Sequence, residues 1–274
     1  MKSADLHLHT VFSDGTYTPQ ELVRKSKKAG LDTIAVTDHD TIGGIEPAMD
    51  VGRIEGLEVL SGIELSAEYL EKEIHILGYL IDYKSPKLKA QLDKLKDNRI
   101  ERIYKIIAKL KEEAGLDLNP GIVFDIAKGG VIGRLHIARA MVKEGLAGSV
   151  AQAFQKYIGD KCPAYVLGFK FTPAQAIKLI KDAAGVPILA HPYIINDDNL
   201  ILEFVKDGLM GLEAYYPEHT QGMVNFYVDF CKKNNLLITG GSDCHGSAKP
   251  EVKIGSVKIP YEMVDKLKEA RQRL

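Results

Sequence analysis

The sequence predicts an α/β fold with a helical insertion, and three observations lead to this expectation. Strand and helix signals alternate over residues 1–82, and the same rhythm returns over residues 166–274. Between them, over residues 83–165, strand signals nearly vanish and helical patterns dominate. Strands that alternate with helices imply a parallel sheet, either open or closed. We therefore expect the two outer segments to form one α/β domain and residues 83–165 to form a helical lid on it.

The first outer segment opens with an expected strand at residues 5–9, followed by a capped helix. Thr18 is the expected N-cap and Glu21 its partner in a capping box, with Pro19 as the first helical residue. Gly30 then ends this helix in a left-handed conformation. The runs DTIAV, LEVLSGIE and EIHILGY follow as expected strands.

The second outer segment repeats this pattern. A capped helix at residues 172–185 precedes the strand runs VPILA, LMGLEAYYP and LLITG, which have helices between them, and a last strand and a closing helix follow. In the insertion, a one-sided apolar stripe predicts a long helix before three shorter ones. The stripe consists of Leu88, Leu92, Leu95, Ile103, Ile106 and Leu110.

Size, composition and charge describe an ordinary globular protein. The chain has 274 residues, 45% of them hydrophobic and 27% charged, and its formal net charge of -1 lacks the basic field of a dedicated DNA-binding domain. No run of about eighteen apolar residues occurs and no signal peptide precedes the first strand, so we expect no membrane span and a cytoplasmic location. The three cysteines show neither zinc-site spacing nor a disulfide framework, and Cys244 is expected to pack in the interior.

The start of the insertion is locally basic. Between Lys84 and Lys111, ten Lys or Arg residues stand against three Asp or Glu residues. Such a run is either a solvated helix face or an electrostatic guide for an anionic substrate. Arg99 falls on the apolar stripe of the same helix, where it either points at the site or, as we expect, forms a buried structural ion pair.

Ionisable side chains collect where the expected strands end. His39 follows DTIAV, Glu64 follows EVLSGI and His191 follows VPILA. Asp243 and His245 follow LLITG in the same way. Parallel strands of an α/β barrel all end at one rim, and active-site groups gather there. The sequence therefore predicts that these side chains share one site.

Three further histidines add to this group. His7 and His9 end the first strand two residues apart, so they share one face and can bind one metal ion. His75 lies within the fourth expected strand. The imidazoles and carboxylates together exceed what one tetrahedral ion needs. Nitrogen and carboxylate donors without thiolates suit Zn, Mn or Fe, and a carboxylate that bridges two ions is typical of two-metal hydrolases.

Taken in order, DLHLHTVFSDG, TDHD, GIE, HILGY, AHP and GSDCH resemble the motifs of the PHP (polymerase and histidinol phosphatase) family of metal-dependent phosphoesterases. The resemblance covers nearly the whole chain, including the helical insertion. It implies a distorted (β/α)7 TIM-like barrel with three divalent metal ions at the C-terminal rim.

The resemblance also implies which side chains hold the ions. The first ion is expected on His7, His9, Glu64 and Asp243, the second on Glu64, His75 and His191, and the third on Asp14, His39 and His245. Some family members have histidine at the position of Asp14. Asp14 is an anionic ligand in place of a neutral one, which affects the metal that is preferred but still leaves a ligand at this position.

The charges of such a centre favour a phosphate substrate. Three divalent ions carry more positive charge than three carboxylates cancel, which leaves a surplus for phosphoryl oxygens. Metal ions also lower the pKa of a bridging water to about 7. We therefore expect a metal-bound hydroxide to attack phosphorus in line, so that no serine or cysteine nucleophile is required.

Two residues outside the metal set are expected at the substrate. Resemblance to the subgroup that acts on nucleotides implies that Arg134 and His219 approach the scissile phosphate. Arg134 offers a planar donor fork that matches phosphate, and His219 either binds an oxygen or protonates the departing alkoxide. His136 is either structural or part of the site. Asp38 and Asp40 either fix imidazole tautomers or form a turn.

The expected function is hydrolysis of phosphate monoesters or terminal phosphodiesters of nucleotides. Candidate substrates are 3′,5′-bisphosphonucleotides, nucleoside monophosphates and the 5′ ends of short oligonucleotides, without a stable nucleic-acid complex. One alternative is a histidinol-phosphate phosphatase on the same metal core, although the insertion with GRLHIARA favours nucleotides. Another is a non-catalytic PHP module, but such modules tend to lose ligands and all nine positions are filled here. A third is a metal-dependent amidohydrolase, which often needs a carbamylated lysine that has no counterpart at a strand end here.

Overall fold

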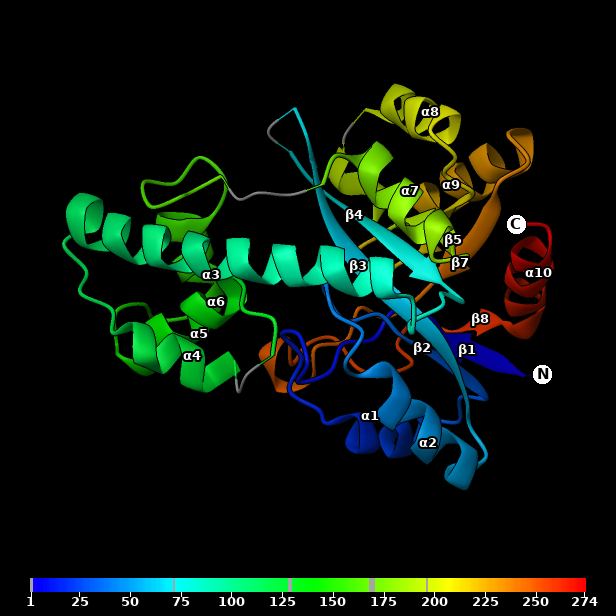
Figure 1. The fold of residues 1–274 in the computed structure, drawn as a ribbon, viewed down its shortest axis with the longest axis horizontal. Helices are drawn as coiled ribbons and strands as arrows, with labels where there is room; N and C mark the ends of the chain where they lie inside the picture. The colour runs from blue at the N-terminus through cyan, green and yellow to red at the C-terminus, as the bar shows by residue number, and fades with distance from the viewer. Residues whose placement is uncertain (1, 71, 128–129, 168–170, 196) are drawn as a thin grey trace.

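The computed structural model describes residues 2–70, 72–127, 130–167, 171–195 and 197–274. In this part of the chain eight strands form one sheet in the order β7-β6-β5-β4-β3-β2-β1-β8 (Figure 1). The strands are β1 (Ser3–Asp5), β2 (Thr33–Val36), β3 (Glu58–Tyr69), β4 (Lys72–Tyr79), β5 (Val186–Leu189), β6 (Gly211–Tyr215), β7 (Leu237–Gly240) and β8 (Ile259–Pro260).

Helices lie between most of these strands. They are α1 (Pro19–Lys28), α2 (Ile45–Glu55), α3 (Pro86–Ala114), α4 (Pro120–Ala127), α5 (Arg134–Lys143), α6 (Val150–Ala153), α7 (Pro173–Asp182), α8 (Asp198–Lys206), α9 (Gln221–Lys233) and α10 (Tyr261–Gln272), with short turns η1 (Phe154–Ile158), η2 (Pro192–Ile195) and η3 (Gly246–Ala248). The capping box of Thr18 and Glu21 is present at the start of α1, as predicted, and Gly30 follows that helix with a φ of 77°.

The sheet curls into a nearly closed barrel because the residues after β1 and β7 contact each other. The N–H of Leu6 donates to the carbonyl of Gly240 at 3.2 Å, and Leu8 pairs with Cys244 as an isolated parallel bridge. The regular part of β1 therefore ends at Asp5, earlier than the sequence predicted. The predicted TIM-like α/β barrel is confirmed.

The sheet is mixed, so a uniformly parallel sheet was the wrong expectation. β1–β2–β3 and β5–β6–β7 pair in parallel, whereas β4 runs antiparallel to β3 and β5, and β8 runs antiparallel to β1. Only two residues separate β3 from β4, and a parallel connection needs about a dozen or more. The chain must therefore reverse there, which distorts the barrel beside the site.

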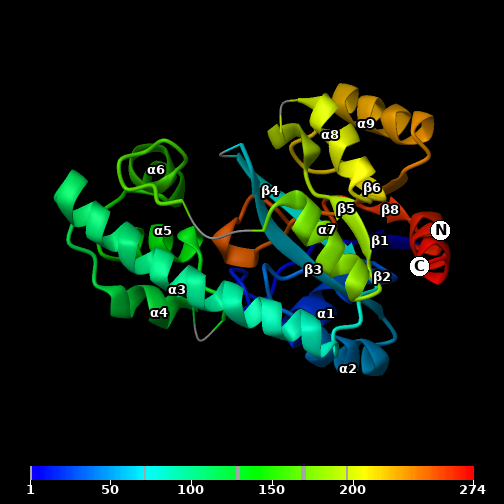
Figure 2. The same cartoon turned by 45° about the horizontal axis from the view of Figure 1, so that its top comes forward.

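The predicted apolar stripe of α3 is buried, and it faces two separate hydrophobic clusters. Leu88, Leu92 and Leu95 pack in the barrel cluster with residues of β3, β4 and α7. Ile103 and Leu110 pack in a second cluster with α4 and α5. Each fully buried Leu or Ile contributes roughly 1.5–3 kcal/mol, so both halves of α3 are firmly held. Figures 1 and 2 show α3 running from the barrel to the group of α4, α5 and α6. The boundaries of the insertion, residues 83–165, stay a prediction.

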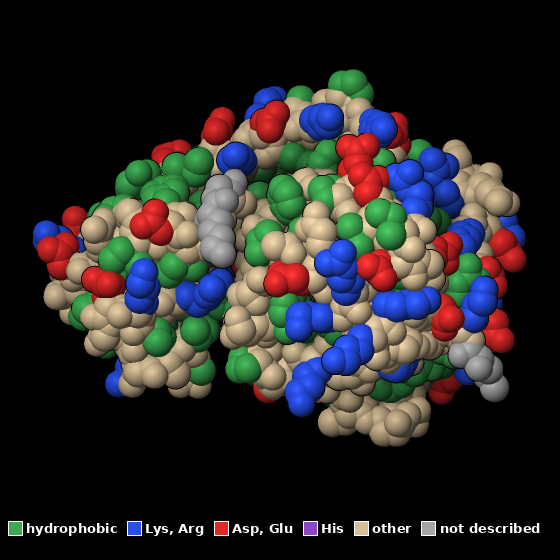
Figure 3. All heavy atoms as spheres, turned by 90° about the horizontal axis from the view of Figure 1, so that it is seen from below, with side chains coloured by type: hydrophobic (Ala, Val, Ile, Leu, Met, Phe, Trp, Pro, Cys, Tyr) green, Lys and Arg blue, Asp and Glu red, His purple; other side chains and the backbone are tan. Residues whose placement is uncertain are grey.

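Both chain ends lie beside α10, on the side of the barrel away from α4–α6 (Figures 1 and 2). On the face drawn in Figure 3, Lys and Arg side chains are interspersed with Asp and Glu side chains. Most lysines in the basic part of α3 are exposed, as a solvated helix face requires, whereas Arg99 and Arg102 are not. No helix in the described residues combines the length and apolar character needed to cross a lipid bilayer.

Candidate metal centre

The nine predicted metal ligands converge at the rim where β1, β2, β5 and β7 end. Six of them are histidines and three are carboxylates. Each histidine has a ring nitrogen within 4.0 Å of an oxygen of one of the three carboxylates. The nine are His7, His9, Asp14, His39, Glu64, His75, His191, Asp243 and His245. The structure thus brings together every residue of this predicted set.

Strand ends place several of these side chains, whereas Glu64 and His75 lie within β3 and β4. His39, His191 and Asp243 follow β2, β5 and β7, as the sequence predicted. Glu64 lies in the middle of β3, because β3 continues past its parallel pairing with β2 into the hairpin with β4. His191 and Asp243 have positive φ angles of 28° and 54°. Such backbone costs about 1–3 kcal/mol per residue and is typical of functional sites.

Glu64 lies at the centre of the cluster. Its Oε2 atom is 3.1 Å from Nε2 of His7 and 3.2 Å from Nδ1 of His39. Its Oε1 atom is 2.8 Å from Nδ1 of His75 and 3.2 Å from Nε2 of His191. The two carboxylate oxygens therefore face two different groups of imidazoles, which is the arrangement that a bridging carboxylate needs.

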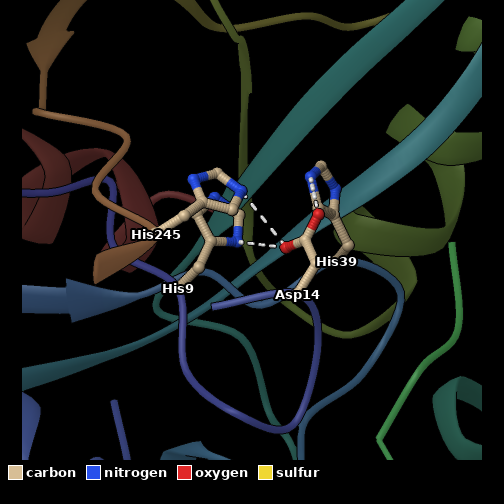
Figure 4. A group of neighbouring side chains, drawn as sticks. All are labelled: His9, Asp14, His39 and His245. Atoms are coloured by element: carbon tan, nitrogen blue, oxygen red, sulfur yellow. Dashed lines mark ion pairs between the residues drawn. The ribbon is translucent and has the colours of Figure 1, made fainter. Parts of the chain in front are cut away.

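A second carboxylate, Asp14, faces a further group of imidazoles (Figure 4). Its Oδ1 atom is 3.2 Å from Nε2 of His245 and 3.9 Å from Nδ1 of His9, and its Oδ2 atom is 4.0 Å from Nε2 of His39. These four side chains offer donor atoms within 4.8 Å of one another, and so do His7, His9, Glu64 and Asp243.

The side-chain atoms of the cluster are arranged to bind cations rather than to form hydrogen bonds with one another. Nδ1 and Nε2 of His9, Nδ1 of His39, Nδ1 of His75 and Oδ1 of Asp14 are buried and form no well-directed hydrogen bond in the described structure, although each lies within 4.0 Å of a carboxylate or imidazole atom of the cluster. Burial opposes a charge on His75, but Glu64 and Glu73 outweigh it and raise its pKa to about 9. Buried polar atoms without partners are costly. A cluster of imidazole and carboxylate atoms of this kind suits divalent metal ions.

Two more carboxylates hold imidazoles in a defined tautomer. Nδ1–H of His7 donates to Oε1 of Glu213 at 2.9 Å, which leaves its Nε2 lone pair to the cluster. Nε2–H of His75 donates to Glu73 at 3.3 Å, which leaves its Nδ1 toward Glu64. Partners of this kind fix ring orientation and raise ligand basicity at metal sites. Neither Glu213 nor Glu73 was predicted.

Asp243 divides its two oxygens between the cluster and two unpredicted neighbours. Its Oδ1 atom lies 3.0 Å from Nε2 of His9. Its Oδ2 atom accepts from Tyr216 at 2.9 Å and from Nζ of Lys249 at 3.0 Å. Although burial opposes ionisation, Lys249 and His245 hold the pKa of Asp243 well below its usual range. Asp243 is therefore an anionic donor at neutral pH.

A cleft of about 890 Å³ opens onto this cluster, with barrel residues on one side and the insertion on the other. From the barrel side Asp14, His39 and His75 line it. From the insertion Arg102 and Arg134 line it, among others. Arg134 begins α5, pairs with Glu73 through Nη2 and contacts Asp160 at 2.8 Å through Nη1. The structure thus places Arg134 next to a partner of His75.

His219 is less directly placed than Arg134. Tyr216, Pro217 and Glu218 are among the described residues that line the cleft, and His219 is not. Its ring packs at 5.5 Å from the ring of Tyr216, and only 9% of the residue is exposed. Its Nδ1–H donates to the carbonyl of Ala214 at 2.9 Å, and its buried Nε2 has no hydrogen-bond partner in the described structure. Burial lowers its pKa.

The remaining alternatives from the sequence have structural answers. His136 is buried, and its Nδ1 accepts from the N–H of Gly133 at 3.1 Å, which holds the start of α5. Asp38 contacts the hydroxyl groups of Thr10 and Ser13, both at 2.7 Å, and so supports a turn.

Asp40 and Arg99 form the ion pair expected for Arg99. Nε of Arg99 donates to Oδ2 of Asp40 at 2.8 Å. The N–H of Ser66 also donates to Asp40, at 2.8 Å, so this carboxylate joins α3 to β3. Cys244 is 1% exposed and packs among apolar residues, as predicted.

The unpredicted residues differ in how far the sequence signals them. Glu213 is a carboxylate inside the buried strand run GLEAY, and a lone charge in such a strand demands a partner. Tyr216 directly follows β6, so the strand-end rule could have found it. Lys249 lies six residues after Asp243 in a loop without a periodic pattern, and Arg102 contacts Tyr165 across the insertion, so neither has a local signal.

Comparison with known proteins agrees with this geometry. The PHP domain model matches residues 5–123. The 5′-3′ exoribonuclease of Haemophilus influenzae is 34% identical over 252 residues, which cover 89% of this chain and 90% of that protein. The 3′,5′-nucleoside bisphosphate phosphatase of Chromobacterium violaceum is 29% identical over 250 residues, covering 89% and 88%.

A solved structure extends the likeness to the fold. A protein from Bifidobacterium adolescentis, assigned as a metal-dependent phosphoesterase, superimposes with a TM-score of 0.90 and 29% identity over 98% of this chain and 96% of that one. A barrel with a cluster of histidine and carboxylate donors at its rim is typical of metal-dependent hydrolases, and the sequence relatives identify the family. The chain belongs to the PHP family.

Proposed function

We propose that this PHP-family hydrolase hydrolyses phosphate monoesters or terminal phosphodiesters of nucleotides, with 3′,5′-bisphosphonucleotides, nucleoside monophosphates or the 5′ ends of short oligonucleotides as its substrates. The observation that carries the proposal is the meeting of nine imidazole and carboxylate side chains around Glu64, in a cleft that Arg134 also lines. The names of the Haemophilus and Chromobacterium relatives support the substrate class. The expected cytoplasmic location stays a prediction.

The proposed metal content is three divalent ions, Mn, Zn or Fe. His7, His9, Glu64 and Asp243 would hold one ion, Glu64, His75 and His191 a second, and Asp14, His39 and His245 a third. The placement of Glu64 between two groups of imidazoles supports a bridging role. Divalent ions in such a cluster polarise the phosphoryl group and lower the pKa of water, which supplies the nucleophile.

The protein's own side chains prepare this reaction. Glu213 and Glu73 orient His7 and His75 and fix the nitrogens that they offer. Arg134 presents a guanidinium to the cleft, where it would bind non-bridging phosphoryl oxygens after leaving Glu73. His219 would bind an oxygen or protonate the leaving alkoxide through Nε2, which is the nitrogen left without a partner.

A substrate panel and metal analysis test the proposal together. Purified protein is analysed for metal, stripped with a chelator, reloaded with Mn²⁺, and assayed for release of inorganic phosphate and, from the dinucleotide, of mononucleotides. The panel contains adenosine 3′,5′-bisphosphate, adenosine 5′-monophosphate, a 5′-phosphorylated dinucleotide and histidinol phosphate. We expect about three ions per chain and preferential turnover of a nucleotide, with none by the stripped protein. Preference for histidinol phosphate would overturn the substrate assignment, and no turnover with any divalent metal would indicate a non-catalytic module.

A further inference from the structure

The loop that carries Asp14, residues 10–17, is held from two sides. On the barrel side, the carboxylate of Asp38 accepts hydrogen bonds from the hydroxyl groups of Thr10 and Ser13, both at 2.7 Å. Ser13 directly precedes Asp14 and is only 1% exposed, so its other face must be covered as well. The helical insertion provides this cover.

The insertion approaches the Asp14 loop backbone against backbone. The N–H of Val131 donates to the carbonyl of Phe12 at 2.8 Å. A Cβ at Gly130 would lie 2.6 Å from the carbonyl oxygen of Val11, and a glycine permits such a close approach. The segment that leads into α5 is therefore docked on the loop.

His136 extends this contact to the residue beside Asp14. Burial lowers the pKa of His136, so the ring is neutral at pH 7 and carries a single N–H. Because Nδ1 accepts from the N–H of Gly133 at 3.1 Å, the proton lies on Nε2, which donates to the backbone carbonyl of Ser13. One imidazole thus holds the first turn of α5 with one nitrogen and the Asp14 loop with the other.

A cavity of about 40 Å³ lies between α5 and the Asp14 loop. Ser13, His136 and Arg139 are among the residues that line it. Such a space has room for water molecules but not for a further side chain. Burial lowers the pKa of Arg139, and the negative charge of Asp14 opposes this effect. The insertion therefore brings both a hydrogen-bond donor and a positive charge to the surroundings of Asp14.

We propose that His136 is a positioning residue that fixes the Asp14 loop in its metal-binding conformation, so that the insertion is part of the metal centre. The inference rests on the proposed metal content, in which Asp14 holds one ion together with His39 and His245. A loop that is ordered before the ion binds spares metal binding the entropic cost of ordering it. Loss of the contact between His136 and Ser13 should therefore weaken this one ion and leave the others in place.

Two amide variants separate the two contacts of the ring. In His136→Asn the side-chain oxygen takes the place of Nδ1 and still accepts from Gly133, but the donor to Ser13 is lost. In His136→Gln the longer side chain brings an N–H group to Ser13, and the acceptor beside Gly133 is lost. A residue that only holds the start of α5 would tolerate Asn better than Gln. A residue that positions the loop would tolerate Gln better than Asn.

Hydrogen exchange on the metal-free protein is the first test. The N–H groups of Val11, Ser13 and Thr16 are hydrogen-bonded to backbone carbonyls, so their exchange reports the order of the loop. Exchange over residues 10–17 should be about 2- to 10-fold faster in His136→Asn than in the wild type, and close to the wild type in His136→Gln. Equal exchange in His136→Asn and the wild type, or acceleration throughout the chain, would overturn the proposal.

Binding of Mn²⁺ is the second test, measured by titration of the metal-free proteins in competition with a chelating dye. In His136→Asn one ion should bind about 10- to 100-fold more weakly, while the remaining ions bind as in the wild type. In His136→Gln all ions should bind as in the wild type. Identical isotherms for His136→Asn and the wild type, or an equal weakening of every ion, would assign His136 a purely structural role and overturn the proposal.

Met141→Ala is the matched control for a loosened insertion. Met141 lies on α5, is buried in the apolar cluster of the insertion, and is not among the described residues that line the cleft or the small cavity. This variant should have a lower melting temperature and an unchanged Mn²⁺ isotherm. Weakening of one ion as in His136→Asn would show that any loosening of the insertion has this effect, which would overturn a specific role of His136.

The two tests keep this inference separate from the proposed function, because neither uses a nucleotide. A protein that hydrolyses nucleotides would still contradict the role of His136 if His136→Asn exchanged and bound Mn²⁺ as the wild type does. A protein that hydrolyses none of the tested nucleotides would still support it if the two amide variants differed as expected.

Discussion

Nδ1 of His7 lies 2.9 Å from Oε1 of Glu213, and both side chains are fully buried. The second oxygen of Glu213 accepts from the backbone N–H of His191 at 2.9 Å. One carboxylate inside β6 therefore positions two candidate ligands that come from the ends of β1 and β5. Because it holds the Nδ1–H tautomer of His7, it directs the Nε2 lone pair at Glu64 and Asp243.

Glu213→Gln should weaken metal binding about 10- to 100-fold, the usual effect of losing such an outer partner. The glutamine side chain has a single neutral carbonyl oxygen, so it can no longer offer an anionic oxygen to both His7 and His191. Competition of Mn²⁺ with a chelating dye measures the affinity. The control is Glu203→Gln on α8, where the carboxylate accepts from Tyr69 at the surface, far from any ligand. Unchanged affinity in Glu213→Gln would show that Glu213 only fills space.

Asp243→Ala should abolish turnover and leave the fold largely intact. The change removes a donor oxygen that faces His9 and leaves Lys249 unpaired at the cleft. We expect phosphate release at the level of metal-stripped protein and an unchanged far-ultraviolet circular dichroism spectrum. The melting temperature of the metal-free protein should move by less than about 5 °C, or roughly 1–2 kcal/mol. Asp229→Ala, at an exposed aspartate of α9, is the control, and loss of activity there or retention in Asp243→Ala would contradict the assignment.

Arg134→Ala should raise KM about 10- to 100-fold and change kcat less, because a charged hydrogen bond to the bound phosphate is lost. Steady-state kinetics on the nucleotide that the wild type prefers measures both constants. Lys143→Ala on the same helix is the control, since Lys143 is exposed in the last turn of α5 and does not line the cleft. Full activity of Arg134→Ala would remove Arg134 from the site.

The sequence predicted the barrel and the cluster because both depend on local patterns. The strand-end rule located His39, His191 and Asp243 correctly, since their strands end at the same rim. The rule placed Glu64 just after the end of a strand, whereas it lies in the middle of β3. Whether β3 stops or continues into a hairpin depends on its pairing with β4, which lies outside any local pattern.

Contacts between distant segments set the limit of the sequence argument. Arg134 of α5 meets Glu73 of β4, 61 residues earlier in the chain, and Arg102 meets Tyr165 across the insertion. The segments after β7 and β1 also approach closely, because a Cβ at Gly241 would lie 2.3 Å from the backbone nitrogen of His7. No periodicity or spacing in one sequence encodes such approaches, so the outer partners of the site had to come from the structure.

Glu58→Gln should destabilise the fold modestly above pH 4.5 and have no effect in acid. Burial opposes ionisation of Glu58, but hydrogen bonds from Lys268, Thr33 and Tyr261 outweigh it and lower its pKa below the usual 4.5. A carboxylate with a depressed folded pKa stabilises above its unfolded pKa, and this contribution is lost as the pH falls through the folded pKa. Because the side chain is 35% exposed, solvent screening limits the effect to about 0.5–1 kcal/mol at pH 7. Urea unfolding at pH 7 and pH 3 measures it against Asp265→Asn, an exposed position of α10, and a difference that persists at pH 3 would refute this electrostatic origin.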